Sequence, residues 1–315
     1  METKQEEDSP VDHWMAHRST VVEDPPVLDH KRLTFAALSP QSIGTLLQDA
    51  FRALSPITEC PRLEAEVLLA HLLDVPRATL LAHPERKLGR RDVAEYQSLV
   101  AQRSLDYPLP YLTGEVEFYG LPFEVSPEVL IPRPATETLV DLALDYSPNR
   151  VIDVGTGSGC IAVALALYSE VDSICAIDIS SAALAVAQRN VERHGVSEKV
   201  DLIAGDVLCP RPERADLIVS NPPYVAAGEE AALPPSVRNH EPRVALDGGL
   251  DGMDVIRKLL AQAPGVLHPN GAILIEIGAT QGERSIELAR TYYPDADICV
   301  HPDLAGRDRV LAIQT

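Results

Sequence analysis

The feature that most constrains the fold is a regular alternation of strand-like and helix-like segments over roughly the last 175 residues. The strand-like runs are largely apolar, without a regular polar alternation, which is typical of strands buried on both faces. We expect strands at 150–154, 173–178, 200–204, 215–220, 271–277, 296–301 and 309–314, and helices near 159–169, 180–194, 252–264 and 281–291. The predicted fold class is therefore α/β, a seven-stranded doubly wound (Rossmann-like) domain. Its last two strands are close enough in sequence to pair antiparallel.

The segments before this domain differ from it in composition. The predicted organisation is a disordered acidic tail at 1–38, a small helical domain at 39–106, a β-hairpin-like connector at 107–134 and the α/β domain at 135–315. The tail is polar and lacks periodicity. Ser39 and Pro40 resemble a helix start, a capping hydroxyl followed by proline, and three apolar stripes at helical spacing follow. The connector alternates prolines with β-rich runs. Nothing in the helical domain looks catalytic, so we expect it to bind a partner or cover a site.

Charge and hydropathy limit the classes of partner. Lys and Arg number 27 against 47 Asp and Glu, a formal net charge of −20. This charge repels a phosphate backbone over most of the surface. The longest apolar run, Cys160–Tyr168, is far shorter than the roughly 20 residues that cross a membrane, and the first residues lack a targeting composition. We expect a cytoplasmic monomer with no direct nucleic-acid partner and no membrane partner.

No metal site is expected from the sequence. The five cysteines are scattered and form no CxxC pair, which favours reduced thiols over disulfides or a zinc site. Asp247, Asp251 and Asp254 do not have the spacing of EF-hand ligands, and the distal Glu of that loop is missing. We interpret this stretch as a glycine-rich structural loop.

A glycine-rich loop follows the first predicted strand. It reads Asp153-Val154-Gly155-Thr156-Gly157-Ser158-Gly159, and a helix begins directly after it. Glycines let a ligand approach the backbone closely, and the helix start offers free N–H groups. The spacing is GxGxG, whereas dinucleotide sites have GxGxxG. This spacing disfavours an NAD dehydrogenase and suits a ligand without a pyrophosphate.

Two acidic residues extend this half of the site. Asp178 ends the second strand, where a carboxylate can accept hydrogen bonds from both ribose hydroxyls. Asp206 follows the third strand, near where an adenine edge would lie. Together with the loop, these acids predict a nucleoside-containing cofactor.

The fourth strand ends in Asn221-Pro222-Pro223-Tyr224. Ligands of open α/β sheets bind beyond the carboxyl ends of such strands. The Asn221 side-chain oxygen and the Pro222 carbonyl are two acceptors that can hold both hydrogens of an –NH2 group, and Tyr224 can stack on its plane. Holding the two N–H bonds fixes the direction of the nitrogen lone pair. If the nucleoside carries a sulfonium methyl, in-line methyl transfer follows, helped chiefly by proximity and orientation.

These motifs together resemble those of the S-adenosylmethionine-dependent amino-methyltransferases. Three further stretches narrow the resemblance to the HemK/PrmC family of release factor glutamine methyltransferases: Gly120–Phe123 with Leu130–Pro134, Glu241–Leu246 with Gly248–Gly252, and Asp303–Asp308. The resemblance covers roughly residues 40–315. Members of that family methylate the side-chain amide nitrogen (N5) of the glutamine in the Gly-Gly-Gln loop of class-I peptide chain release factors.

The resemblance implies roles for individual residues. It assigns to the cofactor S-adenosyl-L-methionine the residues Gly155, Thr156, Gly157, Ser158, Gly159, Asp178, Asp206, Val207 and Asn221. It assigns to the glutamine substrate the residues Asn221, Pro222, Pro223, Tyr224, Phe123 and Arg133, of which Asn221, Pro222 and Tyr224 are the catalytic candidates. The helical domain would then bind the release factor.

The chain departs from the family pattern at two positions. Ala135 replaces the first acid of Ile-Pro-Arg-Pro-Glu-Thr-Glu, whereas Glu137 remains. Val207 stands where some relatives have an aromatic ring, so we expect weaker adenine stacking. The motifs for methyl transfer are unchanged.

Two other functions are consistent with parts of the pattern. The same Asn-Pro-Pro-Tyr geometry serves the exocyclic amine of adenine, so an adenine-N6 DNA or RNA methyltransferase is the alternative. That activity needs a basic groove, which the net charge of −20 argues against. A nucleoside-sensing module without catalysis would leave the Asn-Pro-Pro-Tyr motif without a purpose.

Overall fold

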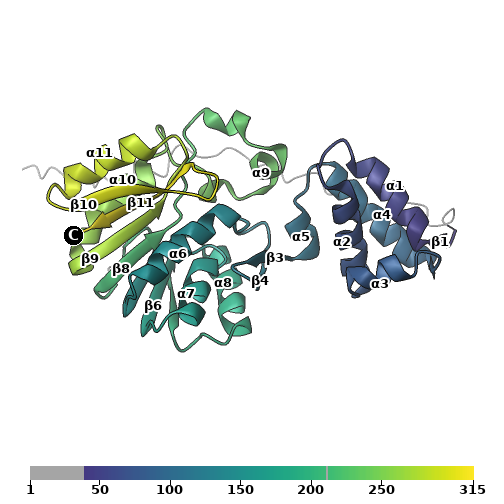
Figure 1. Cartoon of the computed structure of the whole chain (residues 1–315), viewed down its shortest axis with the longest axis horizontal. Helices are drawn as coiled ribbons and strands as arrows, with labels where there is room; N and C mark the ends of the chain where they lie inside the picture. Colours follow the sequence, from purple (N-terminus) through teal and green to yellow (C-terminus); the bar gives the residue numbers. More distant parts are fainter. Residues whose placement is uncertain (1–38, 211) are drawn as a thin grey trace, which may run out of the picture. The chain divides into compact units, whose positions relative to one another are not determined.

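The computed structural model describes residues 39–210 and 212–315 (Figure 1). The tail predicted at 1–38 lies outside the described residues. The first described elements are β1 (Gln41–Ser42), α1 (Ile43–Leu54), α2 (Pro61–Leu73), α3 (Arg77–Ala82), β2 (Lys87–Leu88) and α4 (Arg90–Ser104). These elements form the helical region that the apolar stripes predict.

The start of α1 differs from the prediction. Ser42, and not Ser39, caps the helix, since its Oγ accepts a hydrogen bond from the Thr45 N–H at 3.2 Å. Gln41 and Ser42 pair with β2, which keeps the backbone extended just past Pro40. The helix therefore begins three residues later than the Ser-Pro pair suggests, because a strand pairing that is distant in sequence competes with it.

Helices α1, α2 and α4 pack around a shared apolar interior. Tyr96 of α4 is 1% exposed and donates its hydroxyl to the Ala65 carbonyl of α2 at 2.9 Å. Arg103 of α4 donates to Glu64 of α2 at 2.6 Å. A buried hydroxyl with a partner and a shielded ion pair fix the register of α4 on α2.

The connector contains the predicted hairpin and an additional helical turn. Strands β3 (Glu115–Phe118) and β4 (Leu121–Glu124) pair antiparallel, joined by Tyr119 and Gly120, both at positive φ. This is the backbone of a tight two-residue hairpin turn. The short helix α5 (Leu109–Thr113) precedes it, with Pro110 in its first turn. The proline-rich composition of this segment does not predict α5, because proline favours both loops and helix starts.

The α/β domain has the predicted seven-stranded sheet. Its strands are β5 (Arg150–Val154), β6 (Ser173–Asp178), β7 (Val200–Ala204), β8 (Ala215–Ser220), β9 (Leu267–Glu276), β10 (Asp297–Pro302) and β11 (Asp308–Gln314). Their order is β10-β11-β9-β8-β5-β6-β7. The strands from β5 to β9 pair parallel, and β11 pairs antiparallel with both β9 and β10. The predicted fold class is confirmed.

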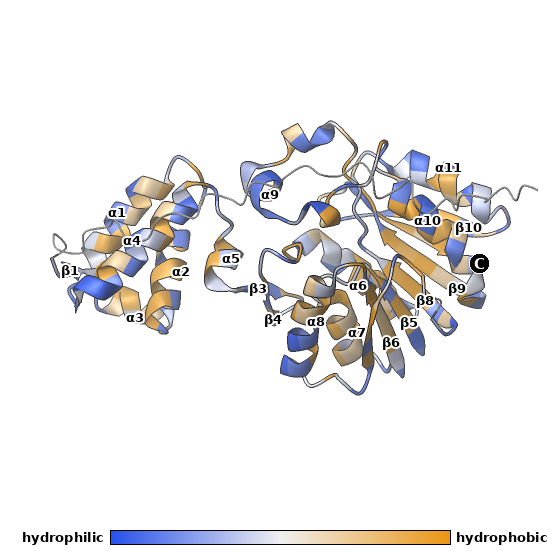
Figure 2. Cartoon of the chain, turned by 180° about the vertical axis from the view of Figure 1, so that it is seen from behind, coloured by the Kyte–Doolittle hydropathy of each residue, from blue (hydrophilic) through white to orange (hydrophobic). Residues whose placement is uncertain are grey.

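Helices cover both faces of this sheet. One face carries α6 (Glu137–Asp145), α7 (Cys160–Tyr168) and α8 (Ser181–Arg193), and the other carries α10 (Asp254–Gln262) and α11 (Gly282–Tyr292). Along β5, Val151 packs into the apolar cluster beneath α6, α7 and α8, and Ile152 packs into the cluster beneath α10 and α11. The central strands are mostly hydrophobic in Figure 2 because both of their faces are covered.

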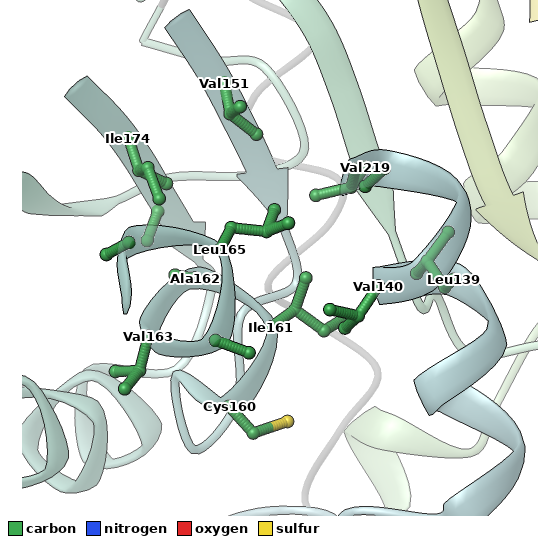
Figure 3. Packing of buried hydrophobic residues seen from close by; sticks show 14 of the residues in the cluster. Leu139, Val140, Val151, Cys160, Ile161, Ala162, Val163, Leu165, Ile174 and Val219 are labelled. Carbon is green, nitrogen blue, oxygen red and sulfur yellow. The ribbon is translucent and has the colours of Figure 1, made fainter. Parts of the chain in front are cut away.

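Helix α7 is the most enclosed element of the core. Seven of its nine residues are buried, which explains why the longest apolar run of the sequence is a helix without a polar face. Figure 3 shows Ile161 and Leu165 of α7 within the cluster that also contains Val151 of β5 and Val140 of α6. The glycine-rich loop that leads into α7 therefore starts from a rigid base.

The topology brings the two predicted motifs together. Strand β5 pairs with β6 on one side and with β8 on the other, so the strand order reverses at β5. The Ser220 hydroxyl at the end of β8 donates to the Val154 carbonyl at the end of β5, at 2.7 Å. The glycine loop and the Asn221 segment consequently leave the sheet side by side, at the switch point where α/β sheets bind ligands.

Candidate active site

The glycine loop is a tight turn held against β6. The N–H groups of Gly155 and Thr156 both donate to the Ile177 carbonyl, at 2.8 and 3.0 Å. Gly155, Gly157 and Gly159 all have positive φ, between 57° and 80°. Other residues adopt this backbone only with strain, which explains the GxGxG spacing. At Gly159 an added Cβ would also lie 3.3 Å from the Ala187 Cβ, so α7 packs closely on α8 there.

Asp178 is fixed by two backbone hydrogen bonds at the end of β6. Its Oδ2 accepts from the Gly157 N–H at 2.8 Å, and its Oδ1 accepts from the Ser180 N–H at 2.9 Å. Burial raises the pKa of Asp178, and these two hydrogen bonds oppose the rise. A carboxylate has about four lone-pair directions. Asp178 therefore has capacity for further donors while its orientation stays fixed.

The turn after β7 contains Asp206 and Val207. The Asp206 carboxylate is half-exposed and pairs with Lys258 of α10. Val207 has φ +60°, and its side chain packs into the apolar layer beneath the turn. A positive φ is unusual for a β-branched residue, so the backbone of this turn is strained.

A buried acid lies beneath the glycine loop. Asp153 is completely buried, and its Oδ2 accepts from the Thr156 hydroxyl at 2.7 Å. Its Oδ1 has no hydrogen-bond partner among the described residues. Burial raises the pKa of Asp153 to about 7, and the nearby Asp178 carboxylate adds to the rise.

The Asn221 side chain has a defined orientation. Its Nδ2 donates to the Thr136 hydroxyl at 3.1 Å, so the Oδ1 end is the one that remains for a ligand. Thr136 belongs to the 3₁₀ turn η2 (Pro134–Thr136) that precedes α6. A Cβ added at Gly155 would lie 3.9 Å from the Asn221 carbonyl oxygen, which places the glycine loop directly beside this segment.

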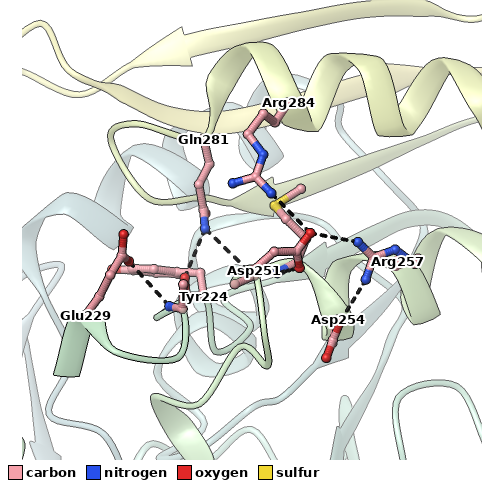
Figure 4. A network of polar contacts seen from close by, with 10 residues as sticks. Tyr224, Glu229, Asp251, Asp254, Arg257, Gln281 and Arg284 are labelled. Carbon is pink, nitrogen blue, oxygen red and sulfur yellow. Dashed lines mark hydrogen bonds and ion pairs between the residues drawn. The ribbon is translucent and has the colours of Figure 1, made fainter.

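A polar network fixes the backbone behind Tyr224 (Figure 4). Gln281 accepts from the Gly278 N–H at 2.8 Å and donates its Nε2 to the carbonyls of Tyr224 and Gly252, at 2.9 and 3.4 Å. A Cβ added at Gly252 would lie 2.5 Å from the Tyr224 carbonyl oxygen, and one at Gly248 would lie 2.8 Å from the Tyr224 Cα. These glycines allow their loop to pack directly on the Asn-Pro-Pro-Tyr segment.

The aspartates of that loop pair with arginines. Asp251 accepts from Arg257 and Arg284 at 3.0 and 3.1 Å, and Asp254 accepts from Arg257 at 2.7 Å. Among the described residues, no group of three or more His, Cys, Asp or Glu side chains could hold a metal ion. The carboxylates hold the loop on α10 and α11.

Two residues assigned to substrate binding have other contacts here. Phe123 is completely buried and packs against Phe118 and His194. A fully enclosed ring cannot reach a substrate, so we correct its assignment to core packing. Arg133 pairs with the buried carboxylate of Glu241, which joins the 131–134 segment to the segment after α9 (Pro235–His240). This ion pair uses part of its guanidinium.

Comparison with known proteins identifies the family. Two family models match, the PrmC N-terminal domain over residues 45–114 and the methyltransferase small domain over residues 134–234. The release factor glutamine methyltransferase of Moorella thermoacetica is 44% identical over 256 residues, 80% of this chain and 90% of its own. The protein of the same name from Nitratidesulfovibrio vulgaris is 39% identical over 283 residues, 88% of this chain and 96% of its own. The chain belongs to the release factor glutamine methyltransferase family.

The solved structures agree at the level of the fold. The catalytic domain of hMettl16, in complex with MAT2A 3′UTR hairpin 6, matches with a TM-score of 0.50 at 17% identity over 71% of this chain and 81% of its own. At this identity the likeness shows a shared methyltransferase fold alone.

Ala135 is the position at which this chain lacks the first acid of the family pattern. Ala135 lies in η2, directly before Thr136. The neighbouring acid, Glu137, accepts from the Tyr119 N–H at 2.8 Å and so holds the β3–β4 turn. Glu137 therefore has a structural contact that does not depend on the side chain at 135.

Sequence reasoning missed Thr136, Gln281 and Glu276, all of which are buried near the Asn-Pro-Pro-Tyr segment. Glu276 ends the buried strand β9, so the rule that singled out Asp178, an acid at the carboxyl end of a strand, also applies to it. Thr136 and Gln281 gave no such signal, because only the fold brings them to Asn221 and Tyr224.

Proposed function

We propose that this enzyme transfers a methyl group from S-adenosyl-L-methionine to the N5 side-chain amide nitrogen of the Gly-Gly-Gln glutamine of class-I peptide chain release factors. The observation that carries the proposal is the adjacency of two segments: the glycine loop after β5 borders the Asn221 segment after β8. Family membership supports the glutamine as the acceptor of the methyl group.

The first ligand site fits the cofactor. Asp178, oriented by the N–H groups of Gly157 and Ser180, receives the ribose hydroxyls, and the glycine loop passes beneath the nucleoside. The turn with Asp206 and Val207 borders the adenine. The absence of side chains at Gly155 and Gly157 leaves the space that the ligand needs.

The second ligand site holds the acceptor. Asn221 Oδ1 and the Pro222 carbonyl accept the two N–H hydrogens of the glutamine amide, and Tyr224 stacks on its plane. These contacts aim the nitrogen lone pair and favour the conformation in which it can attack. The bound cofactor supplies a sulfonium methyl; the new N–C bond forms as the S–C bond breaks. One amide proton then leaves to solvent.

The partner and location follow from the same proposal. The helical domain at 39–106 binds the release factor, and the connector and the domain at 135–315 present its glutamine to the cofactor. We further propose that the enzyme acts as a cytoplasmic monomer without direct nucleic-acid contact. No helix among the described residues is long and apolar enough to span a membrane.

The test is methyl transfer to a purified release factor. Labelled S-adenosylmethionine is incubated with the wild-type factor, with a variant whose Gly-Gly-Gln glutamine is alanine, and with duplex DNA and RNA. We expect label on the wild-type factor alone. Label on DNA or RNA instead would assign the protein to the adenine-N6 class, and equal label on the glutamine variant would place the methyl group on another residue.

A further inference from the structure

The Asn221 carboxamide has two chemically different ends that occupy nearly the same volume. The Oδ1 end accepts hydrogen bonds, whereas the Nδ2 end donates them. A substrate –NH2 group needs the accepting end. A rotation of 180° about the last side-chain bond would present the Nδ2 end and repel the substrate N–H groups. Something in the protein must therefore fix which end faces the substrate.

Thr136 contacts the far end of this carboxamide. Its side chain is 2% exposed, and its Oγ lies 3.1 Å from Asn221 Nδ2. A hydroxyl has a single proton and can also accept. If Thr136 donated that proton to Asn221, the carboxamide would turn its Oδ1 toward Thr136. The destination of the Thr136 proton therefore decides the orientation of Asn221.

Glu276 is the group that can take this proton. It is 1% exposed at the end of β9, and its Oε2 has no hydrogen-bond partner among the described residues. The nearby Thr136 hydroxyl is the donor that can reach this carboxylate, and it lowers the pKa of Glu276. Burial raises the pKa of Glu276. The Thr136 hydroxyl and the positive charges of Arg309 and Arg133 oppose this rise. Arg309 Nη1 lies 4.0 Å from its Oε1. An ionised carboxylate accepts hydrogen bonds and cannot donate them.

We propose that Glu276 and Thr136 are positioning residues that set the orientation of the Asn221 carboxamide. Glu276 accepts the Thr136 proton, Thr136 can then only accept from Asn221 Nδ2, and Asn221 Oδ1 faces the substrate amide. The three residues come from β9, η2 and the segment after β8, so this relay can form only in the folded domain. The inference rests on the proposed function for its substrate.

Kinetics on the release factor test the relay at mildly alkaline pH. Thr136→Val keeps the shape and removes the hydroxyl, and Glu276→Gln adds a donor that competes for the Thr136 oxygen. We expect each to lower kcat by about 100-fold, because misoriented reacting groups cost rates of this order. S-adenosylmethionine affinity should stay at the wild-type value. Thr136→Ser should restore kcat, and Thr291→Val, which removes an exposed hydroxyl of α11, is the matched control.

A double mutant separates orientation from packing. In Asn221→Asp both ends of the side chain accept, so its orientation no longer matters. We expect Glu276→Gln to leave the residual activity of Asn221→Asp unchanged or higher, since it also removes a neighbouring negative charge. A further loss of about 100-fold in the double mutant would overturn the proposal and make Glu276 a packing residue.

A spectroscopic readout tests the relay without the release factor. The chain has five asparagines, so 15N-asparagine labelling gives few side-chain NH2 signals, and Asn221→Asp identifies that of residue 221. We expect this signal to be protected from solvent exchange in the wild type and in Thr136→Ser, and unprotected in Thr136→Val and Glu276→Gln. Protection that persists in the last two variants would overturn the proposal, even if the release factor proves not to be the substrate.

Discussion

Arg133 and Glu241 form an ion pair that joins two segments 108 residues apart in the chain. The Glu241 side chain is 2% exposed, whereas that of Arg133 is 35% exposed. Glu241 also accepts from the Ile131 N–H at 3.3 Å. The contact lies between two of the stretches that carry the family resemblance, and it connects the segment before Thr136 to the segment after α9.

Removal of either partner should have unequal effects on stability. Arg133→Met leaves a buried carboxylate without its cation, and we expect a loss of about 3 kcal/mol in the free energy of unfolding. Glu241→Gln leaves a half-exposed guanidinium that water can solvate, so its loss should be smaller. Denaturant unfolding measures both. Arg150→Met, at the exposed Arg150–Glu213 pair, is the control and should change little. Equal losses for the two partners would contradict this reading of the burial.

The same variants test the substrate role that the sequence assigns to Arg133. If Arg133 also contacts the release factor, Arg133→Met should raise KM for the factor well above the value in Glu241→Gln. Steady-state kinetics at a temperature where both variants are folded make this comparison. Equal KM values would leave Arg133 with a structural role alone.

Asn221→Ala should nearly abolish methyl transfer and leave S-adenosylmethionine binding largely intact. The substitution removes the Oδ1 acceptor that holds the substrate amide. Single-turnover transfer and calorimetric binding measure the two effects separately. Asn239→Ala, at an exposed position of α9, is the matched control. Full activity in Asn221→Ala would exclude its role in holding the amide.

Asp178→Ala should weaken cofactor binding instead. The loss of charged hydrogen bonds to the ribose costs about 2 kcal/mol, roughly a 30-fold rise in Kd. Calorimetric titration with S-adenosylmethionine measures this rise. Asp201→Ala, on an exposed position of the neighbouring strand β7, should bind as the wild type does. An unchanged Kd in Asp178→Ala would refute the ribose assignment.

Gly252→Ala should lower methyl transfer because its Cβ would lie 2.5 Å from the Tyr224 carbonyl oxygen. Gly306→Ala provides a matched comparison, since Gly306 has nearly the same positive φ and nothing within 4 Å of an added Cβ. Both variants should lose about 1 kcal/mol of stability from the strained backbone. Only Gly252→Ala should displace the Asn-Pro-Pro-Tyr segment and lower kcat. Equal kcat values for the two variants would show that this contact does not position Tyr224.

Asp153 should make stability depend on pH. Its pKa is raised from the ordinary value of 3.8 to about 7 in the folded protein. Between these two pH values the folded state keeps a proton that the unfolded state has lost. The resulting stabilisation is fully present below pH 3.8 and is lost as the pH rises through about 7. Asp153→Asn cannot ionise, so its melting temperature relative to that of the wild type should rise as the pH increases from 5 to about 7 and then level off. A difference that does not vary with pH would contradict the raised pKa.

The sequence alone determined the fold class, the seven strands, the glycine loop, Asp178 and the Asn221–Tyr224 segment. These features are local: buried strands are largely apolar runs, positive φ selects glycine, and Asp178 and Asn221 stand directly at the ends of strands. Each of these features depends only on residues that are neighbours in the sequence.

Only the tertiary structure decided which distant groups contact one another. It placed Phe123 in the core, paired Arg133 with Glu241, moved the helix cap of α1 to Ser42 and brought Thr136 to Asn221. The physical reason is the same in each case. Burial and hydrogen-bond partners depend on contacts between side chains of different elements. A single sequence does not show which side chains are in contact.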